Sequence, residues 1–141
     1  MNAEKTTLIS HPAAAARLWV VCLCAQWCPA CNDYQAVFAG LAATMGQRHP
    51  ATRFVWIDVE DQADLVGDLD IETFPTLLVG DGDGVRFLGA VTPQADVLSR
   101  LLEAMHQPDA PRGPHRPDSL RIIEQLAACP DVWLRESLAK I

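Results

Sequence analysis

The feature that most constrains the fold is an unbroken apolar run that leads into a pair of closely spaced cysteines. Residues 18–25 (LWVVCLCA) are all apolar. An apolar, β-rich run without polar alternation is typical of a strand buried on both faces, at the centre of a parallel or mixed sheet. The run is eight residues long. Because a bilayer span needs about 20 apolar residues, we expect no transmembrane helix.

The residues after this run predict alternating helices and strands. An apolar stripe at three- and four-residue spacing indicates a helix that ends near Gly46; its members are Tyr34, Val37, Phe38, Leu41 and Met45. The other predicted elements are a helix over 10–17, strands over 54–59, 74–79 and 85–88, and helices over 61–68 and 92–106. This order predicts one α/β domain over residues 1–106, with a central mixed sheet flanked by helices.

A proline-rich segment follows this domain. Prolines recur every third residue, the period of a polyproline II helix, at positions 108, 111, 114 and 117. Residues 107–117 therefore predict a semi-rigid linker, and the alternative is a PxxP ligand for an adaptor domain.

Residues 118–141 predict a C-terminal helical hairpin extension. Its two apolar stripes are Leu120, Ile123, Leu126 and Ala127 in the first helix and Leu134, Leu138 and Ile141 in the second. Two short helices cannot bury such faces alone. We therefore expect them to dock on the main domain or on a second copy of the chain, as in a homodimer.

Charge and cysteine content narrow the classes of partner. The net charge is −7, and nine acidic residues with no Lys or Arg lie between Asp58 and Asp83. Such a surface repels phosphate and anionic lipid, so we expect neither nucleic acid nor membrane as a partner. It is either a solvated face or a surface that selects basic proteins. The N-terminus lacks the pattern of a secretory signal, so we expect a cytoplasmic protein, in which five cysteines indicate catalysis or metal binding.

The motif Cys28-Pro29-Ala30-Cys31 lies where the buried strand ends and a helix begins. A thiol at a helix N-terminus faces unpaired N–H groups, which favour the thiolate that attacks disulfides. Pro29 presets the helical φ angle, and the spacing brings the second sulfur close to the first. We expect Cys28 to be the nucleophile and Cys31 the resolving thiol of a redox-active disulfide. The alternative is half of a zinc site, which needs a second pair of ligands.

Three features together resemble the thioredoxin superfamily in order and spacing over residues 6–106. They are Trp27-Cys28-Pro29-Ala30-Cys31, Phe74-Pro75-Thr76 and Gly89. The resemblance implies a thioredoxin-like fold with a cis Phe74–Pro75 bond against the active disulfide. It also implies that the Phe74 backbone is available to a substrate strand. The residues expected to support the active site are Trp27, Pro29, Ala30, Phe74, Pro75, Cys22 and Cys24.

The chain departs from the family pattern around the redox pair. The family's buried aspartate falls on Cys22, and an aromatic residue falls on Cys24. The accompanying lysine falls on Phe54, and the proline that kinks the helix falls on Ala36. The resemblance thus implies a redox pair without the family's proton-handling groups.

Cys22 and Cys24 are two residues apart, so on a strand both side chains point to one face, below the motif. They are either buried small hydrophobes, an auxiliary dithiol that exchanges with the active pair, or metal ligands. The spacing Cys24-x3-Cys28-x2-Cys31 matches the cluster motif of radical SAM enzymes, but those enzymes need a much larger barrel than 141 residues can build. We expect Cys129 to be inert unless the tail carries it to the active pair.

These observations predict a cytoplasmic thiol–disulfide oxidoreductase that reduces protein disulfides and needs no metal and no cofactor beyond its own disulfide. Cys28 attacks, Cys31 resolves, and Pro75 shapes the substrate groove. The sequence has no Gly-rich nucleotide-binding loop, so electrons would come from a thioredoxin reductase or a small thiol. The alternative is a binding module or assembly chaperone that works through the acidic face and the helical tail.

Overall fold

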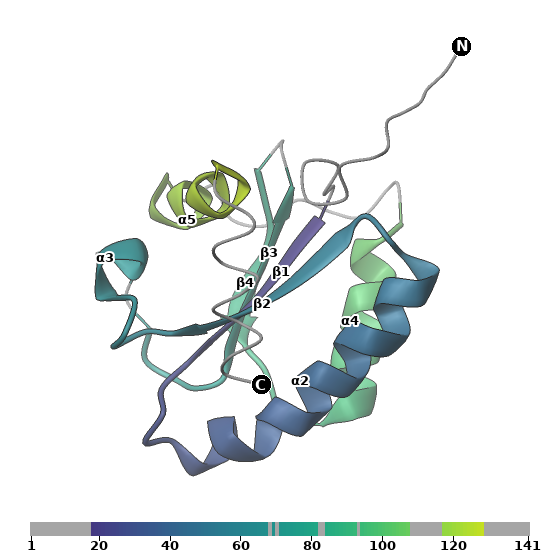
Figure 1. Cartoon of the computed structure of the whole chain (residues 1–141), viewed down its shortest axis with the longest axis horizontal. Coiled ribbons are helices and arrows are strands. Elements are labelled where there is room, and N and C mark those ends of the chain that lie inside the picture. Colours follow the sequence, from purple (N-terminus) through teal and green to yellow (C-terminus); the bar gives the residue numbers. More distant parts are fainter. Residues whose placement is uncertain are drawn as a thin grey trace.

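A computed structural model describes residues 18–67, 69, 71–81, 84–92, 94–107 and 117–128. In order, the elements are β1 (Leu18–Cys24), α2 (Pro29–Arg48), β2 (Thr52–Asp58), α3 (Ala63–Val66), β3 (Thr76–Asp81), β4 (Gly84–Ala90), α4 (Ala95–Met105) and α5 (Pro117–Ala128). Strands and helices alternate from β1 to β3, and a strand and two helices follow (Figure 1).

The four strands form one mixed sheet in the order β2-β1-β3-β4. β1 pairs in parallel with β2 and antiparallel with β3, and β4 pairs antiparallel with β3 at the edge. All seven residues of β1 are buried. The structure therefore confirms the predicted buried strand and the mixed α/β sheet.

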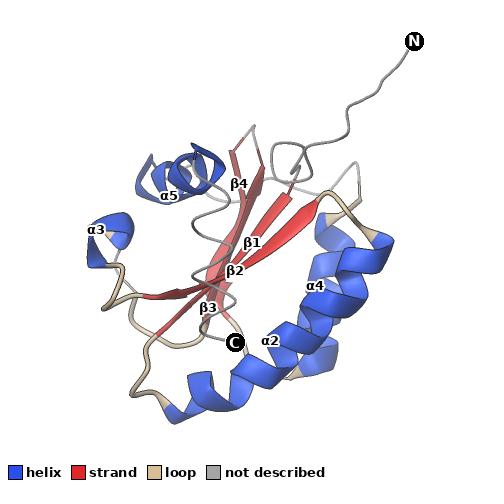
Figure 2. Ribbon diagram, viewed as in Figure 1, coloured by secondary structure: helices blue, strands red, loops and turns tan. Residues whose placement is uncertain are grey.

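Helices cover both faces of this sheet (Figure 2). α2 and α4 lie on one face, and α3 and α5 lie on the other. Side chains of β1 alternate between the two cores: Val20, Cys22 and Cys24 pack with α2 and α4, whereas Val21 and Leu23 pack with α3 and α5. The alternation places both strand cysteines on the face that carries the N-terminus of α2.

α5, the first helix of the predicted extension, docks on the main domain. Ile122, Ile123 and Leu126 are buried in the same core cluster as Val21 and Leu65. The buried stripe differs from the predicted one, because Ile122 faces the sheet and Ala127 is exposed. Packing on the sheet selects the i, i+3, i+4, i+7 stripe that begins at Ser119, which is itself fully buried.

α5 also caps α3. The Arg121 guanidinium donates a hydrogen bond to the carbonyl of Leu65, with the nitrogen 2.9 Å from the oxygen. Gly67, which ends α3, has φ = +61°, and a Cβ there would collide with the Arg121 guanidinium. The positive φ favours glycine at this point, and a side chain there would displace the Arg121 guanidinium from its place beside α3.

The remaining predictions fall at element boundaries or beyond the described residues. α3 is shorter than the helix predicted over 61–68, because the Asp58 carboxylate accepts hydrogen bonds from the N–H groups of Glu60 and Asp61 and makes that segment a turn. The helix predicted over 10–17, most of the linker and the second helix of the hairpin lie outside the described residues. No helix in the part described is long and apolar enough to cross a membrane.

Candidate active site

The cysteine motif lies at the junction predicted for it, between the end of β1 and the start of α2. The Cys28 N–H donates to the carbonyl of Ala25 at 3.1 Å, which turns the chain after the strand. Cys28 is the N-cap of α2, with extended φ and ψ of −84° and 116°, and Pro29 is the first helical residue. Cys28 is partly exposed, whereas Cys31, one turn into the helix, is 1 % exposed. The first thiol is therefore the accessible one of the pair.

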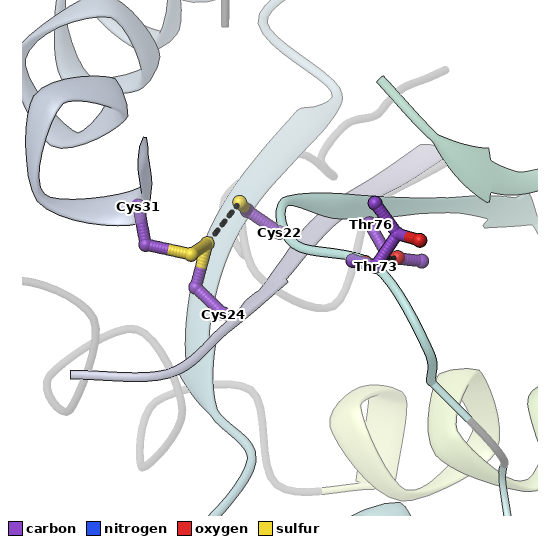
Figure 3. The surroundings of a disulfide bond; sticks show 5 residues. All are labelled: Cys22, Cys24, Cys31, Thr73 and Thr76. Carbon is purple, nitrogen blue, oxygen red and sulfur yellow. Dashed lines mark hydrogen bonds between the residues drawn. A yellow bond between two sulfur atoms is a disulfide. The ribbon is translucent and has the colours of Figure 1, made fainter. Parts of the chain in front are cut away.

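The disulfide in the structure differs from the expected Cys28–Cys31 bond. Cys31 is bonded to Cys24, the last residue of β1 (Figure 3). Cys28 is a free thiol. The Cα atoms of Cys24 and Cys31 are 5.8 Å apart, within the range that a disulfide bridges. Packing of α2 on β1 brings these two residues together. The shared strand face predicted that Cys24 lies below the motif, but the spacing does not show which sulfur Cys31 bonds.

Cys22 lies directly beside this disulfide. Its Sγ atom is 3.6 Å from the Cys24 Sγ atom, and because Cys24 is bonded, the Cys22 S–H is the donor. Burial raises the pKa of the Cys22 thiol well above its usual range, so the group is neutral near pH 7. The structure confirms that Cys22 and Cys24 share the face below the motif.

The Tyr34 hydroxyl is a buried polar group in the same core that sequence reasoning overlooked. Tyr34 is fully buried on α2, and its hydroxyl has no hydrogen-bond partner among the described residues. Burial, and secondarily the charge of a Cys22 thiolate, raise the pKa of Tyr34. In the sequence, Tyr34 is only one member of an apolar stripe, and nothing there distinguishes its hydroxyl from a solvated one.

The loop before β3 contains the expected cis peptide bond, between Phe74 and Pro75. The Thr76 hydroxyl donates to the carbonyl of Thr73 at 2.5 Å across this bond (Figure 3). The Val91 N–H donates to the carbonyl of Pro75 at 3.1 Å. Pro75 is buried and Phe74 is partly exposed. The loop is therefore held at both sides of the proline, with Phe74 at the surface.

Trp27 connects three loops at the rim of the site. It is 63 % exposed, and its indole N–H donates to the Glu60 carboxylate at 3.2 Å. Its ring meets the Phe74 ring edge to face, with the centroids 5.7 Å apart. Sequence reasoning missed Glu60. The available signal was topology, because the carboxyl ends of parallel β1 and β2 lie at one edge of the sheet.

The described residues contain no group of three or more His, Cys, Asp and Glu placed to hold a metal ion. Cys129 lies outside the described residues. What the site contains is an accessible thiol at a helix N-terminus, a buried disulfide one helical turn away and a rim formed by Trp27 and Phe74. These groups are suited to thiol–disulfide exchange.

Comparisons with known proteins agree with this chemistry. The family model described as Thioredoxin matches residues 4–103. A putative thioredoxin H10 of Arabidopsis thaliana is 32 % identical over 80 residues, which are 55 % of this chain and 49 % of that protein. The chain thus spans about half the length of that relative.

Solved structures show the same fold. The germline-specific thioredoxin Deadhead of Drosophila melanogaster has a TM-score of 0.56 at 20 % identity, covering 64 % of this chain and 83 % of that one. The zinc-bound form of human ERp44 has a TM-score of 0.60 at 16 % identity, covering 70 % of this chain and 28 % of that one. Family membership supports the general class of thiol–disulfide oxidoreductase. With the family model spanning most of its length, this chain belongs to the thioredoxin family.

Proposed function

We propose that this protein reduces disulfide bonds of other proteins, with Cys28 as the nucleophile. The observation that carries the proposal is the partly exposed Cys28 thiol at the N-cap of α2, one turn from buried Cys31. An accessible thiol meets the substrate, and a buried one acts only on what the first has captured.

The reaction begins with both Cys28 and Cys31 as thiols. The Cys28 thiolate attacks one sulfur of the substrate disulfide, forms a mixed disulfide and releases the other sulfur as a thiolate. Cys31 then attacks the Cys28 sulfur, forms the Cys28–Cys31 disulfide and releases the reduced substrate. Two electrons have passed to the substrate, and a thioredoxin reductase or a small thiol returns them.

The rim of the site supports a protein as substrate. Trp27 and Phe74 offer partly exposed aromatic surface next to Cys28, and the Phe74-Pro75 loop offers backbone to an extended chain. Glu60, Asp61 and Glu72 on neighbouring loops are exposed. An acidic rim favours substrates with basic residues near the disulfide. The proposal places the reaction in the cytoplasm, where thiols are kept reduced.

Insulin-disulfide turnover tests the proposal. The full chain should reduce insulin with dithiothreitol as electron donor, and Cys28→Ser should abolish turnover. Cys31→Ser should trap mixed disulfides with substrate proteins, whereas Cys28→Ser should trap none. Cys129→Ser is the control, because that cysteine lies outside the motif. Full activity in Cys28→Ser would refute the proposal. Suppression of insulin aggregation without turnover would favour the binding module or chaperone instead.

A further inference from the structure

Cys31 has two sulfur partners within reach, and the structure joins it to the one outside the motif. Cys28 precedes it by three residues at the N-cap, and Cys24 faces it from β1 with 5.8 Å between the Cα atoms. We propose that Cys24 is a third redox-active residue. After each turnover it replaces Cys28 as the disulfide partner of Cys31, so that the disulfide is stored in the core. This inference rests on the proposed function, which supplies the Cys28–Cys31 disulfide.

The step is a thiol–disulfide exchange within the chain. The Cys24 thiol gives up its proton as its sulfur attacks the Cys31 sulfur, and the net proton transfer is to Cys28, the partly exposed thiol that leaves. The Cys24–Cys31 bond forms, the Cys28–Cys31 bond breaks, and Cys28 leaves as a thiolate that takes up a proton. One disulfide replaces another, so no external oxidant or reductant is needed.

Burial favours the Cys24–Cys31 disulfide over the Cys28–Cys31 disulfide. Cys24 and Cys31 are each 1 % exposed, and Cys28 is partly exposed. A disulfide is uncharged and has no proton to donate, which suits an apolar core. The thiol that remains is more stable where water can solvate it. The exchange therefore moves the bond inward and the free thiol outward, and the structure contains the product of that step, a Cys24–Cys31 disulfide with a free Cys28.

The exchange has a consequence for the catalytic cycle. Oxidised protein keeps a free Cys28 thiol that can attack a second substrate, but bonded Cys31 cannot resolve the new mixed disulfide. Reductants reach the stored disulfide by the reverse step, in which Cys28 attacks Cys31 and brings the bond back to the surface. Cys24 thus stores the disulfide while Cys28 is free. Once Cys28 has captured a second substrate, the reverse step is closed, and an external thiol must first reduce that mixed disulfide and release Cys28.

Cys22 provides a matched control for Cys24. It is also a buried cysteine on the same face of β1, with its sulfur 3.6 Å from the Cys24 sulfur. Cys22 remains a free thiol while Cys24 is bonded to Cys31, although both are buried. Loss of Cys22 should leave the exchange intact, whereas loss of Cys24 should abolish it.

Differential alkylation of the full chain tests the inference. The reduced protein is oxidised with hydroxyethyl disulfide, quenched in acid at successive times and denatured. Free thiols are labelled with N-ethylmaleimide, and after reduction the disulfide thiols are labelled with iodoacetamide. The tryptic peptide 18–48 contains Cys22, Cys24, Cys28 and Cys31 and excludes Cys129, so fragment ions assign each label.

In the wild type we expect Cys28 and Cys31 to carry iodoacetamide first. In samples quenched later, Cys28 should carry N-ethylmaleimide, as a free thiol, and Cys24 should carry iodoacetamide, as a disulfide thiol. In Cys24→Ser and Cys24→Ala, Cys28 should stay in the disulfide at all times, and Cys22→Ser should match the wild type. Persistent Cys28–Cys31 labelling in the wild type would overturn the inference. So would a Cys28→Ser variant that forms Cys24–Cys31 as fast as the wild type.

The same variants separate this inference from the proposed function. If Cys28→Ser abolishes insulin turnover but Cys28–Cys31 labelling persists in the wild type, the function holds and the exchange is wrong. If Cys28→Ser reduces insulin at the wild-type rate, the proposed function itself fails.

Discussion

The Trp27 ring meets the Phe74 ring edge to face, with 5.7 Å between the centroids and planes at 82°. Trp27 precedes the nucleophilic cysteine, and Phe74 precedes the cis proline, so this contact joins the two loops that border Cys28. The Glu60 carboxylate accepts a hydrogen bond from the indole N–H and so connects a third loop to this contact. The rim is thus one assembly built from segments up to 47 residues apart in the sequence, from position 27 to position 74.

Trp27→Ala should lower insulin turnover about two- to tenfold, because an edge-to-face pair contributes about 0.5–1.5 kcal/mol to positioning the two loops. The free energy of unfolding should fall by no more than about 0.5–1.5 kcal/mol, since the same ring contact also stabilises the fold while most of the indole is exposed. Trp27→Phe keeps the ring contact and Glu60→Gln weakens only the hydrogen bond, so both should retain most activity. Turnover in Trp27→Ala equal to the wild type would contradict a role for the rim.

Cys22→Asp should speed resolution of the mixed disulfide near neutral pH. Cys22 is a neutral thiol with a raised pKa and is a poor base, whereas a carboxylate there can accept the proton of the resolving thiol. Stopped-flow resolution of a pre-formed mixed disulfide measures the rate. Cys22→Asn, which has the same shape without the charge, is the control and should resolve no faster than the wild type.

The same substitution should destabilise the fold by about 3 kcal/mol or more, because Phe54 offers no cation to the buried carboxylate. Urea unfolding of Cys22→Asp and Cys22→Asn separates this cost from the effect on rate. If Cys22→Asp folds and resolves no faster, solvent or another group already takes the proton.

Leu126→Ala should lower the free energy of unfolding by about 2–5 kcal/mol, because Leu126 is fully buried between α5 and the sheet. Gln125→Ala, the exposed neighbour on the same helix, should change it by less than about 0.5 kcal/mol. Chemical unfolding of both variants checks the difference, and size-exclusion chromatography checks for a dimer. Equal stability of the two variants would show that α5 does not support the domain in solution.

His106→Gln should reduce the slope with which the free energy of unfolding falls in mild acid. Burial lowers the pKa of His106, and its ring stacks on His49 with the centroids 3.7 Å apart. As the pH falls from about 7 to 5, the unfolded chain binds a proton that the folded protein resists, so the free energy of unfolding falls. Urea unfolding at pH 5, 6 and 7 measures the slope. An unchanged slope in His106→Gln would assign the acid sensitivity to other groups.

Local sequence was enough to predict the elements that carry the chemistry. The apolar run that begins at Leu18 forms β1, which ends at Cys24, because a short, β-rich run without polar alternation is suited to a strand buried on both faces. Pro29 begins α2 after a four-residue turn, because proline is favoured in the first helical turn. The cis bond before Pro75 followed only from the family resemblance, since no local pattern distinguishes it from a trans bond.

Tertiary packing decided what local sequence could not. Cys31 pairs with Cys24 because α2 crosses the end of β1 on the face to which Cys24 points, and this distance depends on how a helix packs on a sheet. Glu60 becomes the partner of Trp27 because parallel pairing of β1 and β2 aligns their ends. The sequence by itself determined the order of the strands and helices and the position of the cysteine motif between β1 and α2. Only the packing of these elements decided which sulfur Cys31 bonds, because that choice depends on separations in space rather than along the chain.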